Sequence, residues 1–363
     1  MAQAQFMMLV GTRKGLWIAR SEDRRTWTWD EPRFLMEEVY SCMIDTRGGS
    51  TRLLVGSGSP HWGPHVYRSD DLGETWQETP NIMVLPEDAG TGVQQIWQLW
   101  PSAAEPEVVY AGTQPSALFR SEDRGETFEL VRSLWDHPHR PQWGAGFGGQ
   151  AIHTILPHPH DPDRMLVAMS TGGVYRSDDA RKSWAPANQG IIAGFMPEGQ
   201  QYPEFGQCVH KVTRHPEHPD RLYAQNHGGV YRSDDGGDTW TSIGDSLSSD
   251  FGFPVVVHPG EPETVFVFPN GAGESRFPPE AKARVWRSKD AGASWDVLGG
   301  GLPDGFYSSV LRDAMTADDA GDAAGLYLGS RAGNVFVSID GGEQWQEVVS
   351  NLPDVVVVRA ALV

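Results

Sequence analysis

A short motif that recurs seven times constrains this chain more than any other feature. Each copy starts with serine, carries aspartate two residues later and ends on an aromatic residue, as in "SDDLGETW" and "SDDGGDTW". The copies begin at Ser21, Ser69, Ser121, Ser177, Ser233, Ser288 and Ser338. Their separation of 48 to 56 residues is the length of a four-stranded propeller blade with its loops.

The surroundings of each copy indicate a tight turn between two strands. A short apolar run such as "GVYR" precedes it, and a run that begins with tryptophan, such as "TWQET", usually follows. Serine and aspartate side chains can bond nearby backbone amides, and glycine supplies positive φ. The aspartates, which resemble a metal loop or a catalytic pair, are therefore expected to be scaffold. Two more strands precede each pair, and we name the four strands A to D.

The chain ends complete the pattern. The N-terminal "QFMMLVGT" is a B strand and the C-terminal "VVVVRAALV" is an A strand, so the two ends together form one blade. Ring closure removes exposed sheet edges. The sequence therefore predicts an all-β fold, a single seven-bladed β-propeller of four-stranded antiparallel blades over residues 1–363, with blade 1 shared between residues 1–32 and 354–363.

Charge and composition exclude several classes of partner. The net charge of −19 is spread along the chain, so its field repels nucleic acid and anionic membranes. No apolar run approaches the roughly 20 residues of a membrane span, and no secretion signal precedes the first strand. We expect a cytoplasmic protein with no nucleic-acid or membrane partner. Cys42 and Cys208 fall in different repeats and are expected to be free thiols.

The repeated motif resembles the Asp-box, or BNR-repeat, families, which include sialidases, sortilin-type receptors, xyloglucanases and a photosystem assembly factor. The resemblance covers nearly the whole chain and implies the propeller fold. It implies less about function, because these relatives include both enzymes and binding proteins. A true sialidase is not expected, since the chain lacks an Arg-Ile-Pro motif and a clear third arginine.

The strand order sorts histidines and loops onto two faces. Turns A–B and C–D share one face, where the A–B turns hold His158, His160, His215, His218 and His258 as turn formers. The opposite face carries the B–C and D–A loops, and three of these are much longer than a hairpin needs: residues 133–150, 190–207 and 268–284. Long loops on a rigid scaffold commonly carry function.

The A strands should line the central channel. Aligning them places one ring of residues at a shared level: Tyr40, Trp97, His153, His210, Phe253, Arg312 and Arg359. Arg312 and Arg359 come from neighbouring blades and would suit a carboxylate or phosphate. The alternative is that Arg312 pairs with Asp313 or a neighbouring carboxylate and only neutralises the channel.

A metal site is a second hypothesis. His153, His210 and His227, with His137, His139 or Glu204 as further candidates, offer ligands for a zinc-like divalent ion, although no metal motif such as H-E-x-x-H is present. The alternative is that these histidines bond substrate or loop backbone. The sequence itself requires no cofactor.

From these residues we expect a glycoside hydrolase-like or lyase-like propeller that binds a small anionic or carbohydrate ligand at the channel mouth. The catalytic candidates are His153, His210, Glu204 and Tyr202. The ligand-binding candidates are Arg312, Arg359, His227, Trp97, Tyr40, His137, His139 and Trp143. The alternative is a non-catalytic propeller that presents its loop face to a protein or a glycan.

Overall fold

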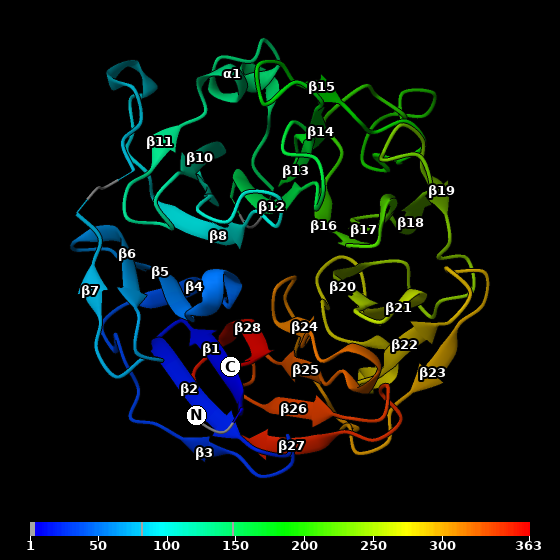
Figure 1. Ribbon diagram of the computed structural model, residues 1–363. Coiled ribbons are helices and arrows are strands. Elements are labelled where there is room, and N and C mark those ends of the chain that lie inside the picture. Colours follow the sequence, from blue (N-terminus) through cyan, green and yellow to red (C-terminus); the bar gives the residue numbers. More distant parts are fainter. Residues whose placement is uncertain (1–3, 81–82, 147–148) are drawn as a thin grey trace.

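The computed structural model describes residues 4–80, 83–146 and 149–363. Seven four-stranded antiparallel sheets follow one another around a ring (Figure 1). The predicted all-β class and the number of blades are confirmed.

Each blade runs from an inner strand A to an outer strand D. In blade order these strands are β28 (Val355–Leu362), β1 (Phe6–Thr12), β2 (Gly15–Ser21) and β3 (Thr28–Trp29); β4 (Glu38–Asp45), β5 (Arg52–Ser59), β6 (Gly63–Ser69) and β7 (Gln77–Glu78); β8 (Gln95–Pro101), β9 (Val109–Gln114), β10 (Ala117–Ser121) and β11 (Glu129–Leu130); β12 (Ala151–Pro157), β13 (Met165–Ser170), β14 (Gly173–Ser177) and β15 (Ala185–Pro186); β16 (Val209–His215), β17 (His218–Asn226), β18 (Gly229–Ser233) and β19 (Thr241–Ser242); β20 (Gly252–His258), β21 (Glu261–Pro269), β22 (Val285–Ser288) and β23 (Asp296–Leu298); β24 (Met315–Ala317), β25 (Leu326–Gly329), β26 (Val335–Ser338) and β27 (Gln346–Val349).

The two chain ends close the ring as expected. Strand β28 pairs antiparallel with β1, from Phe6 opposite Leu362 to Thr12 opposite Val355. Residues 1–3 of the shared blade lie outside the described residues. Closure pairs the edge of β1 and buries the four valines that begin β28.

Helices are short and lie in the connections. They are α1 (Arg132–Trp135), η1 (Arg47–Gly49), η2 (Glu87–Ala89), η3 (Arg140–Gln142), η4 (Pro279–Ala281) and η5 (Gly321–Ala323). Within the described ranges, no helix has the length and apolar character needed to cross a bilayer.

The repeated motif forms a hydrogen-bonded turn between strands C and D in all seven blades. In the second blade the Ser69 hydroxyl donates to Asp71 (2.7 Å) and accepts the Gly73 amide (2.8 Å), while Asp71 accepts the amide and hydroxyl of Thr75. Equivalent Ser–Asp bonds occur in the other six turns. The aspartate side chains are occupied in closing their own turns, as the sequence predicts.

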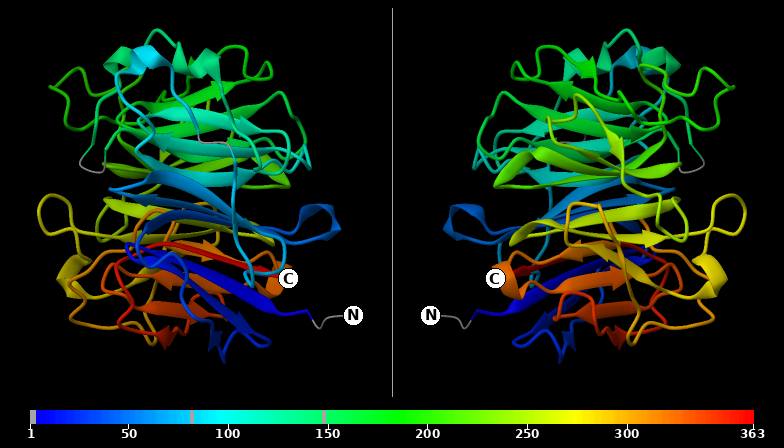
Figure 2. Two further views of the ribbon diagram at one scale, coloured as in Figure 1. Left: turned by 90° about the vertical axis from the view of Figure 1, so that its left-hand side faces the viewer. Right: turned by 90° about the vertical axis from the view of Figure 1, so that its right-hand side faces the viewer.

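The expected sorting of the two faces is confirmed. Side views show the loop between β21 and β22, in yellow, projecting on one side of the ring and the blue η1 turn projecting on the other (Figure 2). In three A–B turns, His158, His215 and His258 accept backbone amides through Nδ1, so they act as turn formers.

The inner strands share a β-bulge near their loop-face ends. Between strands A and B the register shifts around Tyr40, Trp97, His153 and His210, each of which is the extra residue of its blade. A bulge re-aims one side chain without disturbing the rest of the ladder. The bulges therefore place these four residues at the same level of the channel.

Candidate functional site

A cavity of about 650 Å³ opens at the centre of the loop face. All seven blades or their connecting loops contribute to it, as expected for a site on the propeller axis. Its lining comprises Arg13, Tyr40, Gln95, Trp97, Ala145, Gly146, Ser170, Thr171, Phe195, Cys208, His210, His227, Phe251, Phe253, Arg276, Ser309, Leu311, Arg312 and Arg331. We call this space the central cavity.

The lining is basic and aromatic. It holds four arginines and five aromatic residues besides its two histidines, and no aspartate or glutamate occurs among the described residues that line it. Arginine forks favour carboxylate or phosphate, and aromatic faces favour flat or sugar-like surfaces. The central cavity is therefore suited to an anionic ligand.

Arg312 lines the cavity without an ion-pair partner among the described residues. Its Nε donates to the carbonyl of His210 (3.1 Å), and its guanidinium carbon lies 4.9 Å from the centre of the Trp97 ring. Among the described residues no carboxylate pairs with it. Burial lowers its pKa, while the charge of Asp313 opposes that shift.

Asp313 is engaged elsewhere. It accepts the Lys211 ammonium (2.6 Å) and the Arg359 guanidinium (2.6 Å), so the alternative in which Arg312 pairs with Asp313 is not the arrangement found. Burial opposes ionisation of Asp313, but the charges of Lys211 and Arg359 outweigh it and lower the pKa of the carboxyl.

Arg359 does not join Arg312 at the cavity wall. In β28 the register shifts beside Val355 and Val357, so Val356 is the extra residue there, three positions before Arg359. Alignment of the last strand by sequence alone is therefore displaced by three residues. Arg359 neutralises Asp313 in the channel and does not line the described cavity.

His153 and His210 occupy equivalent bulges but differ in their ring nitrogens. His153 is buried, with Nε2 bonded to the carbonyl of Val209 (2.9 Å) and Nδ1 near the Thr154 hydroxyl (3.2 Å). His210 instead uses Nδ1 to reach the carbonyl of Gly252 (2.5 Å), which leaves Nε2 directed elsewhere. His153 therefore joins two blades, and His210 lines the cavity.

His210 Nε2 belongs to a cluster that the sequence did not anticipate. It lies 3.7 Å from Sγ of Cys208, and His227 completes a group whose ligand atoms all lie within 4.8 Å of one another. The expected trio contained His153 in place of Cys208. Burial lowers the pKa of His210 to about 3, so its imidazole is neutral at pH 7. Burial raises the pKa of the Cys208 thiol, against the opposing charges of Arg312 and Arg276.

Five other candidates lie away from the central cavity. Glu204 and the exposed Tyr202 line a separate hollow with Asn188 and Arg176. His137, His139 and Trp143 pack around Tyr175, whose hydroxyl bonds His139 (3.1 Å) and the Trp143 indole (2.9 Å). The last three therefore hold residues 137–143 of the long connection against Tyr175 of β14.

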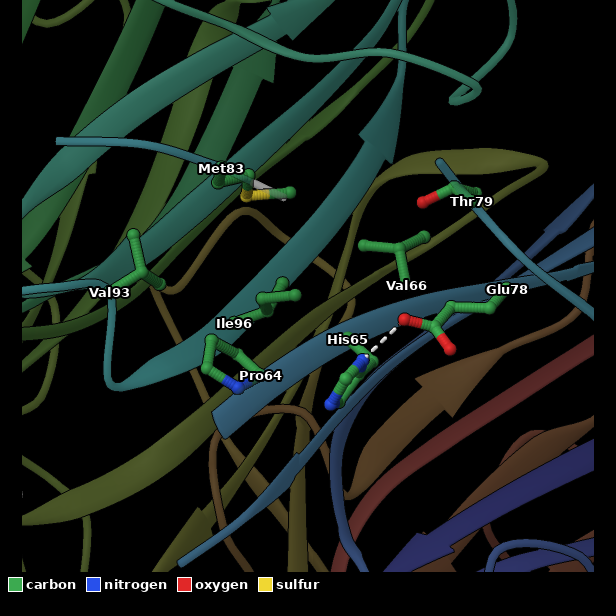
Figure 3. Close-up of a pocket in the computed structure, with 8 residues that line it drawn as sticks. All are labelled: Pro64, His65, Val66, Glu78, Thr79, Met83, Val93 and Ile96. Carbon is green, nitrogen blue, oxygen red and sulfur yellow. Dashed lines mark hydrogen bonds and ion pairs between the residues drawn. The ribbon is translucent and has the colours of Figure 1, made fainter. Parts of the chain in front are cut away.

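A second histidine site on the loop side is too small for a ligand. His65 bonds Glu78 (2.7 Å) beside a hollow of about 10 Å³, which is close to the space of one water molecule (Figure 3). The other nitrogen of His65 lies 3.1 Å from the carbonyl of Trp62. This arrangement fixes the turn between β5 and β6.

Sequence reasoning missed several lining residues. Arg13, Arg276 and Arg331 reach the cavity from B–C loops, and Phe195 and Phe251 reach it from D–A connections. The B–C position of the three arginines was readable from the repeat alignment. Cys208 carried a signal as well, because it stands two residues before His210 at the start of an inner strand.

Comparison with known proteins supports the fold and points to one group of enzymes. No family model matches the chain. Among curated proteins it is 24% identical to a xyloglucanase of Hypocrea jecorina over 280 residues, covering 69% of this chain and 31% of that protein. It is 31% identical to xyloglucanase Xgh74A of Acetivibrio thermocellus over 238 residues, covering 56% of this chain and 26% of that protein. The chain therefore spans less than a third of the length of either relative.

Solved structures share the architecture. An ancestral GH74 enzyme matches 97% of this chain and 41% of its own, with a TM-score of 0.60 and 16% identity. A putative 6-phosphogluconolactonase from Bacteroides fragilis matches 98% of both chains, with a TM-score of 0.59 and 9% identity. At such identities the likeness concerns the fold alone. The chain is a seven-bladed β-propeller whose curated relatives are xyloglucanases.

Proposed function

We propose that the protein is a glycoside hydrolase-like or lyase-like enzyme of the Asp-box type that binds a small acidic carbohydrate in the central cavity. The similarity to xyloglucanases supports the carbohydrate, and the seven Ser–Asp turns support the Asp-box type. The observation that carries the proposal is Arg312, a largely buried guanidinium without an ion-pair partner among the described residues.

The charge of the lining favours elimination over hydrolysis. Glycoside hydrolysis commonly uses two carboxylates that flank the scissile bond, and the described lining of the cavity contains none. Elimination from a uronate needs a cation that neutralises the sugar carboxylate, a base that takes the adjacent C–H proton and an acid that protonates the leaving oxygen. The products are an alcohol and an unsaturated sugar, and no further reactant is needed.

Arg312 is assigned to the carboxylate, with Trp97 beneath it as a stacking surface. The Tyr40 phenol and the imidazoles of His210 and His227 are the groups of the lining that can move protons. Tyr202, Glu204 and His153 are not assigned to proton transfer, because the described cavity does not include them.

The test compares Arg312→Ala and Arg312→Lys with the wild type on a panel of uronate-containing oligosaccharides. Elimination is followed by the ultraviolet absorbance of the new double bond, and binding by calorimetry. We expect Arg312→Ala to lose at least about tenfold in affinity, since a charged hydrogen bond contributes about 1.5–3 kcal/mol. Lysine should restore part of it.

The matched control is Arg132→Ala, because Arg132 at the start of α1 is exposed and forms an ion pair with Asp136 just beyond that helix. It should behave as the wild type. Turnover of neutral oligosaccharides alone, or unchanged uronate binding in Arg312→Ala, would contradict the acidic substrate.

A non-catalytic role is the second candidate. Phe195 and Tyr307 are 56% and 76% exposed, and Trp62 is 64% exposed in the turn between β5 and β6. Exposed aromatic side chains are common in protein and glycan interfaces. If no uronate is turned over but a protein or glycan binds stoichiometrically and is lost on Tyr307→Ser, this role replaces the enzymatic one.

A further inference from the structure

We propose that Cys208, His210 and His227 form a mononuclear zinc site in the wall of the central cavity, with one coordination position open to the ligand. The ligand atoms of the three side chains lie within 4.8 Å of one another. One thiolate and two imidazoles form a donor set that suits zinc, and three protein ligands with an open position are typical of its catalytic sites.

The backbone holds the three residues in place. Cys208 directly precedes β16, and His210 is the bulged residue of that strand. His227 follows the partner strand β17, and its amide donates to the carbonyl of Cys208 (2.9 Å). All three ligands thus stand at the same end of one strand pair, where little rearrangement is needed for them to share an ion.

The orientation of His210 is the one that a metal ligand requires. Its Nδ1–H donates to the carbonyl of Gly252 (2.5 Å), which fixes the tautomer and leaves the lone pair of Nε2 directed at the cluster. His153, at the equivalent bulge, uses both ring nitrogens in other contacts. His210 therefore has a ring nitrogen available to bind a metal, whereas His153 uses both of its ring nitrogens in other contacts.

The spacing fits an ion. Bond lengths of about 2.3 Å to sulfur and 2.0 Å to nitrogen at a tetrahedral angle put the two ligand atoms about 3.5 Å apart. His210 Nε2 and Cys208 Sγ lie 3.7 Å apart in the structure. His227 lines the cavity with His210, and the two ring centres are 5.6 Å apart.

The surrounding charge predicts the fourth ligand. Zinc with one thiolate keeps a net positive charge, and Arg312 and Arg276 line the same cavity. An anion, either hydroxide or a carboxylate oxygen, would balance this charge. The step from zinc to a bound sugar carboxylate rests on the proposed function, but zinc binding itself does not. With both imidazoles bound to the ion, Tyr40 would have to serve in turn, taking the C–H proton as a base and passing it to the leaving oxygen as an acid.

The experiment uses the full chain without a histidine tag, stripped by a chelator and titrated with Zn²⁺ alone and with Co²⁺ as a spectroscopic probe. We expect one equivalent of either ion and a thiolate-to-cobalt charge-transfer band. Cys208→Ser should remove the band. Cys208→Ser and His227→Gln should each weaken Zn²⁺ binding by more than about 100-fold, because loss of a supporting outer-shell contact alone costs about 10- to 100-fold.

The controls are Cys42→Ala, which removes the other thiol, and His65→Gln, which removes a histidine of another blade. Both should retain one equivalent. Circular dichroism and the melting temperature show whether each variant is folded. The cobalt band of the wild type requires no variant, so its absence alone overturns the site, as does unchanged Zn²⁺ affinity in Cys208→Ser.

The two proposals fail separately. Arg312→Ala leaves all three ligands in place, so it should still bind one equivalent of Zn²⁺ while losing the uronate. If the protein binds zinc but acts on no uronate, the proposed metal site stands and the proposed substrate is wrong. Full uronate turnover by a wild type that binds no Zn²⁺ would do the reverse.

Discussion

At the scale of single residues, two neighbouring charges in the channel differ in their partners: Asp313 forms ion pairs, and Arg312 forms none among the described residues. Asp313 is 4% exposed and accepts two cations from other blades, Lys211 and Arg359. Arg312, its neighbour in the chain, has no such partner among the described residues. Removing one member of a buried charge network leaves the others uncompensated, whereas a ligand-binding charge can be removed at little cost to folding.

Asp313→Asn should therefore lower the free energy of unfolding by about 3 kcal/mol, because two cations stay in the channel without their carboxylate. Asp136→Asn, which breaks an exposed pair with Arg132, should cost less than about 1 kcal/mol. Urea unfolding at pH 7 measures both. Equal losses would mean that the buried network contributes no more than a surface pair.

At the scale of the element, each C–D turn surrounds its aspartate carboxylate with hydrogen-bond donors. Asp290 accepts bonds from the hydroxyl of Ser288 (2.7 Å) and from the amide and hydroxyl of Ser294 (2.8 and 2.6 Å). The hydroxyl bonds of Ser294 and Ser288 lower its pKa to about 2, and the carboxyls of Asp71 and Asp179 have the same pKa for similar reasons. The ionised form is therefore the one that holds each turn.

The sign of the pH dependence follows. The folded-state pKa lies below the unfolded value of about 3.9, so this stabilisation is complete above about pH 4 and is lost as pH falls towards 2. Between about pH 4 and pH 2 the melting temperature of Asp290→Asn should fall less than that of the wild type. Asp319 is exposed and lies outside the C–D turns. Asp319→Asn should therefore lose melting temperature between about pH 4 and pH 2 as the wild type does. If the melting temperatures of both variants fell equally between about pH 4 and pH 2, the Asp290 carboxylate would not stabilise its turn.

At the scale of the whole molecule, stability depends on the junction where the two chain ends share a blade. Gly11 of β1 stands opposite Val357 of the neighbouring strand β28 and packs against Val39 of the next blade. A Cβ at this position would stand 2.4 Å from the Val357 side chain and 2.5 Å from the carbonyl oxygen of Val39. The Val357 side chain belongs to the same blade, but the Val39 oxygen is backbone of the next blade, so this second contact cannot relax without moving one blade relative to the other.

Gly11→Ala should accordingly destabilise the ring by about 1–3 kcal/mol, as overpacking of a rigid core does. Gly92→Ala is the matched control, since a Cβ there meets no atom within 4 Å. Thermal unfolding with size-exclusion chromatography measures stability and any opening of the ring. A melting temperature for Gly11→Ala equal to that of Gly92→Ala would show that the junction tolerates separation.

The sequence by itself determined the architecture. Seven motifs at blade spacing specify the number of blades, and the odd strands at the two ends specify closure, because local turn chemistry repeats wherever the chain must reverse. The same repeat assigned the aspartates and the five turn histidines to scaffold. It also placed Tyr40, Trp97 and His210 at the channel, because alignment of equivalent strands carries spatial information.

Only the tertiary structure decided which of those residues meet. The valine-rich last strand contains no residue that marks its bulge, so alignment by sequence alone puts Arg359 three residues out of register. Ring-nitrogen contacts to neighbouring blades distinguish His153 from His210, and such contacts join residues 42 to 56 positions apart. Pairing of Asp313 with Lys211 spans 102 positions. Repeats report local backbone geometry, whereas the partner of a buried polar group depends on which blade closes against which.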